Sequence, residues 1–131
     1  MEERLVETKQ LDNMIELEIY DQSRQVAGDR WRVTLVVKAR VPVEKRFFKD
    51  EGQDSPDIAD MQNVLGDHVT FEQRRERNFV DENEKDEMWR AIYDQFAEST
   101  LGYIAHPDFP MKLILREYKE YLAKRGRCGK L

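Results

Sequence analysis

Two stretches near the amino end alternate between apolar and polar residues. In the first, Ile15, Leu17 and Ile19 alternate with Glu16, Glu18 and Tyr20. In the second, the set Trp31, Val33, Leu35, Val37 and Ala39 alternates with the set Arg30, Arg32, Thr34, Val36, Lys38 and Arg40. Such alternation is typical of strands with one face in the core and one in water. Because the break between them contains Gly28, the pattern predicts an antiparallel hairpin over 14–41 with a long or bulged loop.

Residues 68–79 predict a third strand. Its apolar positions Val69, Phe71 and Phe79 share a face with Gln73, Arg75 and Arg77. We therefore expect the middle of this strand to lie at a sheet edge or in a bulge. A short helix is predicted before it, starting at Ser55–Pro56, carrying Ile58, Met61 and Leu65 on one side and ending at Gly66.

The carboxy-terminal part of the chain has helical periodicity. Over 81–104 a broad apolar arc recurs at helical spacing: Met88, Trp89, Ile92, Tyr93, Phe96, Thr100, Tyr103 and Ile104. His106-Pro107-Asp108 breaks this helix, and its residues fit helix ends and caps. A last helix over 109–125 carries a narrower stripe: Met111, Ile114, Leu115, Tyr118, Tyr121 and Leu122. Gly126 is expected to end it.

The predicted elements give an α+β fold of the order β-β-(short α)-β-α-α, in which two C-terminal helices cover one face of a small antiparallel sheet. We expect a single domain over 1–131, with flexible ends at 1–12 (a frayed terminus or a short helix) and 126–131 and a mobile acidic loop at 49–56. Strand order should be 1-2-3 or 2-1-3. Three strands are few for so many aromatic residues, so an edge is expected to pair with a second copy of the chain.

Composition narrows the classes of function. The net charge of −5 argues against nucleic acid as a partner, because phosphate binding depends on cationic surface. No apolar run approaches the roughly 20 residues that span a bilayer, and the amino end lacks the apolar core of a signal peptide. Cys128 is the only cysteine, so an intramolecular disulfide is excluded. We expect a cytoplasmic protein without membrane contact.

Several polar side chains gather in the hairpin loop. Loops held by rigid strands are common places for binding groups, and anionic ligands are recognised by arginine. The candidate binding residues are Asp21, Arg24, Asp29, Arg30 and Trp31 in the loop, with His68 and Arg75 from the third strand. The structural alternative is that Asp21 and Asp29 only hold the turn together.

No catalytic residue, cofactor site or metal site is predicted. The two histidines and one cysteine have no zinc-ligand spacing, and the acidic loop lacks the rhythm of a calcium site. The sequence also has no nucleotide-binding or hydrolase motif. Basic residues cluster on the second and third strands, but Glu16 and Glu18 on the same outward face are expected to pair with them across strands.

The surplus of apolar helical surface favours a non-catalytic protein-interaction or self-association module, with a protein partner or a second copy of the chain as ligand. One alternative is a small-molecule or enzymatic site at the hairpin loop and third strand, acting on an anionic ligand. Another is RNA binding by the Arg-bearing strands, which would weaken steeply with salt.

Overall fold

The computed structural model describes residues 4–48 and 58–128, the last four by their backbone only. It is an α+β fold, as predicted. A five-stranded sheet contains β1 (Arg4–Gln10), β2 (Glu16–Asp21), β3 (Arg24–Ala27), β4 (Arg30–Pro42) and β5 (His68–Asp81). The helices are α1 (Ile58–Leu65), α2 (Lys85–Ser99), α3 (Leu101–Ala105) and α4 (Phe109–Cys128), with 3₁₀ turns at Lys45–Phe47 and Glu82–Glu84.

Strand β4 is the centre of the sheet. It pairs antiparallel with β2 on one side, where Glu18 lies opposite Lys38, and with β5 on the other, where Arg75 lies opposite Leu35. This confirms the predicted hairpin and the order 1-2-3. The loop of the hairpin contains β3, which pairs with the start of β4 around a turn in which Gly28 has a φ of +55°. Glycine adopts that left-handed conformation without a Cβ clash.

The amino end is a strand, which corrects the prediction of a frayed terminus or short helix over 1–12. β1 pairs with β2 from Arg4, opposite Asp21, to Gln10, opposite Glu16. Its side chains are mostly exposed, and Leu5 and Val6 are among them. Because β1 buries little apolar surface, its residues lack the clear alternation that identified β2 and β4.

The prediction that the third strand lies at an edge is confirmed, since among the described strands β5 pairs only with β4. The register shifts between Trp31, opposite Val80, and Val33, opposite Arg77. Within this irregularity Phe79 has a φ of +57° and points into solvent. Such a backbone angle is rare for a bulky residue and marks a bulge.

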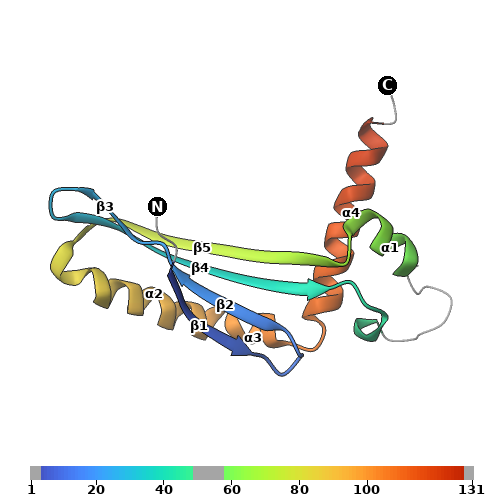
Figure 1. Ribbon diagram of the computed structural model, residues 1–131, viewed down its shortest axis with the longest axis horizontal. Helices are drawn as coiled ribbons and strands as arrows, with labels where there is room; N and C mark the ends of the chain where they lie inside the picture. The colour runs from blue at the N-terminus through green and yellow to red at the C-terminus, as the bar shows by residue number, and fades with distance from the viewer. Residues whose placement is uncertain (1–3, 49–57, 129–131) are drawn as a thin grey trace.

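The core lies on one face of the sheet, where α2 runs beneath β4 and β5 (Figure 1). Ile15, Leu17, Leu35, Ile92 and Phe96 are all buried there. Thr34 and Val36 are also fully buried, although their alternation places them on the face predicted to meet water. For Val36 the reason is local cover by long side chains, since Tyr20 and Arg74 lie opposite it on either side.

The helix predicted over 81–104 is divided. Its first turn is 3₁₀, with the side chain of Asp81 accepting a hydrogen bond from the Asn83 amide, and α2 ends at Ser99. Thr100 has non-helical angles before α3 continues the chain. The guanidinium of Arg75 donates to the hydroxyl of Thr100 over 2.7 Å, which ties this break to β5.

The turn at 106–108 is held from two sides. The imidazole Nδ1 of His106 accepts from the Asp108 amide over 3.0 Å, whereas the sequence predicted that His106 ends one helix and that Asp108 caps the next. The Asn13 amide, from the turn between β1 and β2, donates to the carbonyls of Ile104 and His106 over 2.8 and 2.9 Å. The turn thus fixes where α4 begins.

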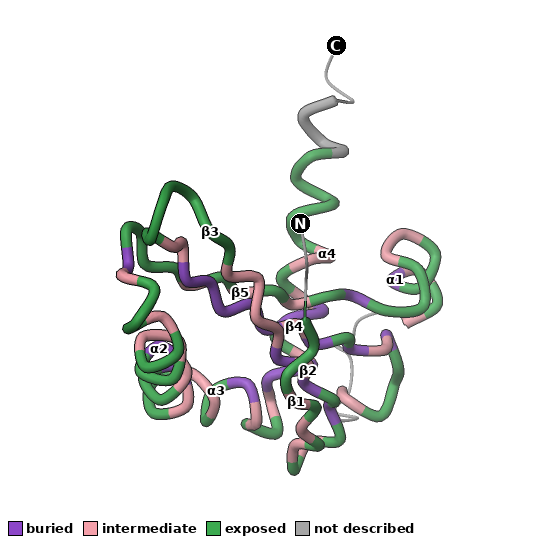
Figure 2. The backbone as a smooth tube through the Cα atoms, turned by 60° about the vertical axis from the view of Figure 1, so that its left-hand side comes forward, coloured by how far each residue is buried: buried purple, intermediate pink, exposed green. Residues whose placement is uncertain are grey.

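Helix α4 crosses the end of the sheet, contacts β5 and α1, and then extends beyond them (Figures 1 and 2). It continues to Cys128, so the prediction that Gly126 ends it is wrong. The helix predicted after Ser55 is present as α1, with Met61 buried and Gly66 following its end at a φ of +85°. The start of that prediction, Ser55–Pro56, and the acidic loop over 49–56 lie outside the described residues.

Candidate functional site

A polar pocket of about 210 Å³ lies where the hairpin loop meets the start of α2. Two of its residues, Asp21 and Trp31, were predicted as binding residues. The full lining is Arg4, Asp21, Ser23, Trp31, Lys85 and Asp86. Four of the six were not predicted. Ser23 is in the loop itself, and the other three were missed because β1 was not recognised as a strand and the start of α2 adjoins the loop only in the folded chain.

The charged groups of this pocket pair with one another. Arg4 contacts the Asp21 carboxylate at 2.9 Å, and Asp21 also accepts from the Ser23 amide at 2.8 Å. The Lys85 amine lies 3.2 Å from Asp86 and 4.9 Å from the centre of the Trp31 ring. An anionic ligand would have to compete with both carboxylates for these cations, so the pocket is poorly suited to the predicted anion.

The remaining loop residues stand outside the pocket lining. Arg30 lies 3.6 Å from Asp81 and 3.8 Å from Asp29, in contacts that link the hairpin turn to the end of β5. Arg24 lies opposite Arg32 in the pairing of β3 with β4. These arrangements match the structural alternative for the turn.

The two predicted residues of the third strand are separated from the loop. His68 lies opposite Pro42, whereas Arg30 lies opposite Asp81 at the other end of the same strand pair. At about 3.3 Å per residue, this separation is roughly 40 Å. Arg75 lies between them and contacts the Ser99 and Thr100 hydroxyls at 3.2 and 2.7 Å. The structure therefore does not assemble the loop and the third strand into one site.

A polar cluster that sequence reasoning missed joins β1 to α2. The Tyr93 hydroxyl donates to the Glu7 carboxylate over 2.8 Å, and the Lys9 amine lies 3.3 Å from the same group. The hydrogen bond from Tyr93 lowers the pKa of Glu7, and burial followed by that bond raises the pKa of Tyr93. The pKa of Lys9 is also raised, first by Tyr93 and then by Glu7.

The outward face of the sheet carries both signs of charge in register. Lys38 lies between Glu18 on β2 and Glu72 on β5, and Arg40 lies opposite Glu16. Arg32 is 3.6 Å from Glu76. Arg32, Lys38 and Arg40 of β4 therefore lie next to carboxylates, as expected from the sequence, instead of forming a continuous cationic stripe.

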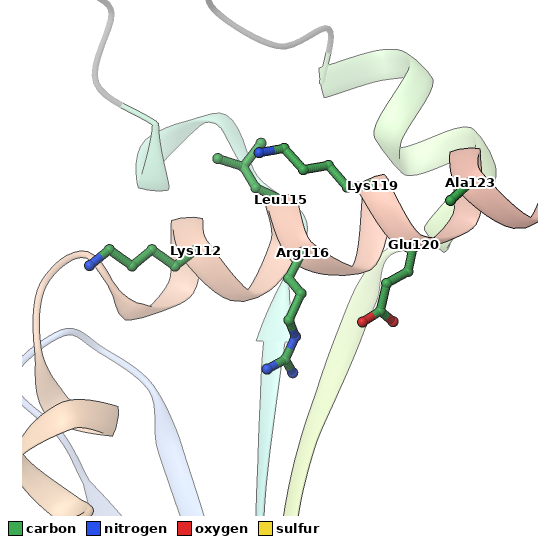
Figure 3. A pocket seen from close by; sticks show the side chains of 6 residues that line it. All are labelled: Lys112, Leu115, Arg116, Lys119, Glu120 and Ala123. Carbon is green, nitrogen blue, oxygen red and sulfur yellow. The ribbon is translucent and has the colours of Figure 1, made fainter.

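A larger and more apolar depression of about 450 Å³ runs along α4 (Figure 3). We call it the α4 groove, and it is lined by Lys112, Leu115, Arg116, Lys119, Glu120 and Ala123. In Figure 3 the side chain of Lys119 reaches back toward Leu115, while Arg116 and Glu120 project from another side of the helix. Its apolar part consists of Leu115, Ala123 and the methylene stems of the lysines.

The exposed apolar residues of α4 continue beyond the groove. Tyr121 and Leu122 are 37% and 42% exposed, although both belong to the stripe predicted to cover the sheet. Ile114, in the same stripe, is fully buried, and so is Leu113, which the stripe did not include. Sequence periodicity found the apolar residues of α4 but could not tell which part of the helix lies over the sheet.

Comparisons with protein-family models, curated proteins and solved structures find no match. Within residues 4–48 and 58–128, no group of three or more His, Cys, Asp or Glu side chains is arranged to hold a metal ion. In the same part of the chain, no helix is long and apolar enough to cross a membrane.

Proposed function

We propose that this chain is a non-catalytic protein-interaction module that docks its ligand on α4. The observation that carries the proposal is the exposure of Leu122 and Tyr121, on a helix that extends beyond the sheet it packs against. Exposed apolar side chains that adjoin one another typically mark an interaction surface. The α4 groove, which includes Leu115 and Ala123, adds a concave surface next to Leu122.

A matched pair of substitutions tests this proposal. Ala123 in the α4 groove and Ala91 on α2 are both exposed, so Ala123→Glu and Ala91→Glu place the same bulky anion on two helices without filling a buried site. A photo-crosslinking amino acid at position 122 then reports on proteins that contact α4 in native cells. We expect a discrete crosslinked protein that disappears with Ala123→Glu and persists with Ala91→Glu.

Sedimentation of the purified chain over a range of concentrations completes the test, because the proposed function includes docking of a second copy of the chain on α4. Concentration-dependent association that Ala123→Glu abolishes would also support docking on α4. A chain that stays monomeric at every concentration and forms no crosslink from position 122 would contradict the proposed function. A crosslink equally sensitive to Ala91→Glu would place the interaction elsewhere.

A further inference from the structure

Four apolar residues of α4 that remain at least partly exposed recur at regular spacing. Met111, Leu115, Tyr118 and Leu122 are spaced four, three and four residues apart, and each is half-buried or exposed. This is the heptad spacing by which one helix receives another along its length. The docking surface of the proposed function therefore has the form of a seam for a helix.

Two lysines flank this seam on one side. Lys112 follows Met111 and Lys119 follows Tyr118, so the two are seven residues apart, about 10 Å along the axis on the same face. Both are exposed, and within residues 4–48 and 58–128 neither has an ion-pair partner. The α4 groove also includes Glu120 and Arg116, which lies 3.8 Å from the Glu117 carboxylate, so Lys112 and Lys119 are its two cations without an ion pair among the described residues.

We propose that the occupant of the α4 groove is an acidic amphipathic helix from another protein, an inference that rests on the proposed function. Apolar side chains of the partner would fill the seam around Leu115 and Leu122. Carboxylates flanking its apolar stripe would pair with Lys112 and Lys119. Charges at these flanking positions select partners in helix pairs, because like charges there oppose association.

Pairing of α4 with α4 from a second copy is disfavoured by the same charges. In an antiparallel pair the lysine flank of one helix faces the lysine flank of the other. In a parallel pair this flank would face Ile114 and Tyr121, but Ile114 is fully buried against the core. Tyr118, itself a residue of the seam, donates a hydrogen bond to Asp60, so α1 already contacts α4 at this position and limits how a second α4 could approach.

A displayed library of helical peptides tests the inference. Each peptide has about three heptads with leucine at the seam positions, and its flanking positions vary among Glu, Gln and Lys. Selection is carried out on the wild-type chain and on the Lys112→Glu/Lys119→Glu variant. We expect glutamate to be enriched on the wild type and lysine on the variant. For purified peptides, replacing two flanking glutamates with glutamine should weaken binding to the wild type about fivefold.

The outcomes separate this inference from the proposed function. Peptides that bind the wild type and lose binding with Ala123→Glu, but show no glutamate preference or prefer lysine, would overturn the acidic partner and leave docking on α4 intact. Single-stranded RNA binding more tightly than the glutamate peptide, or a homodimer that depends on Lys112 and Lys119, would also overturn it. If no peptide binds, the helical partner is overturned, and the crosslinking at position 122 decides the proposed function separately.

Discussion

At the scale of single residues, Asn13 connects the turn between β1 and β2 to the turn that precedes α4. Its side chain donates to two carbonyls more than ninety residues away, and its Oδ1 accepts from the Ile15 amide over 3.2 Å. The Asn13 side chain thus forms hydrogen bonds with backbone groups of its own turn and of the turn that precedes α4. Only a side chain that both donates and accepts can do this, so the residue type is determined by the contact.

Asn13→Asp should lower the free energy of unfolding by about 2 kcal/mol, because it removes both donors and places a carboxylate against two carbonyl oxygens. Urea unfolding at neutral pH measures the change. Asn63→Asp makes the same chemical change at an exposed position of α1 and should have little effect. Equal stability of the two variants would refute the role of Asn13.

The Glu7–Tyr93 contact makes a pH-dependent contribution to stability. The pKa of Glu7 is lowered by the hydrogen bond from Tyr93, so its contribution is present above the ordinary value of 4.5 and is lost as pH falls through the lowered pKa. The pKa of Tyr93 is raised, so its contribution is present below the ordinary value of 10 and is lost as pH rises.

Tyr93→Phe should therefore cost the most stability between about pH 5 and pH 10, with the difference from wild type shrinking on either side. The free energy of unfolding across this range, from urea titrations at each pH, is the measurement. Tyr103→Phe is the control, since Tyr103 is exposed. A pH-independent cost for Tyr93→Phe would show that the hydroxyl contributes through packing alone.

At the scale of elements, β1 protects the edge of β2 more than it fills the core. It carries Arg4, Glu7 and Lys9 along the outer edge of the sheet, and charged residues on an edge strand discourage pairing with other chains. The strand hydrogen bonds it forms with β2 are offset by the conformational entropy of ordering seven residues.

A variant lacking residues 1–10 should consequently lose only about 1–2 kcal/mol of stability, but aggregate at concentrations where the full chain does not. Denaturant unfolding gives the first quantity, and size-exclusion chromatography with light scattering gives the second. A truncated chain that remains as soluble as the full chain would contradict the protective role. A loss of several kcal/mol would show instead that β1 is part of the core.

At the scale of the whole molecule, the long strand pair β4–β5 separates two surfaces (Figure 1). The polar pocket lies at the end where α2 begins, and the α4 groove lies toward the end where β5 begins. The charges of the pocket pair internally, whereas Lys112 and Lys119 of the groove do not. This difference supports the proposal that the chain docks its ligand on α4, and substitutions there should leave the polar pocket unchanged.

The sequence by itself determined the elements with a clear one-sided pattern. The alternation of β2 and β4 and the helical periodicity after residue 81 record which side chains face the core, and the polar residues in the middle of β5 indicated an edge strand. Local chemistry also predicted that Gly66 follows the end of α1 and that residues 106–108 separate two helices. These features depend on neighbours in the sequence, so they can be recognised without the fold.

Only the tertiary structure decided which residues lie together. The fold pairs β1 with β2, although β1 buries too little apolar surface for its residues to alternate clearly. It also places Tyr20 and Arg74 of the adjacent strands on either side of Val36. It also separated His68 from the hairpin loop and left Leu122 exposed. Burial of an apolar stripe depends on where a helix lies relative to the sheet, and periodicity carries no information about that position.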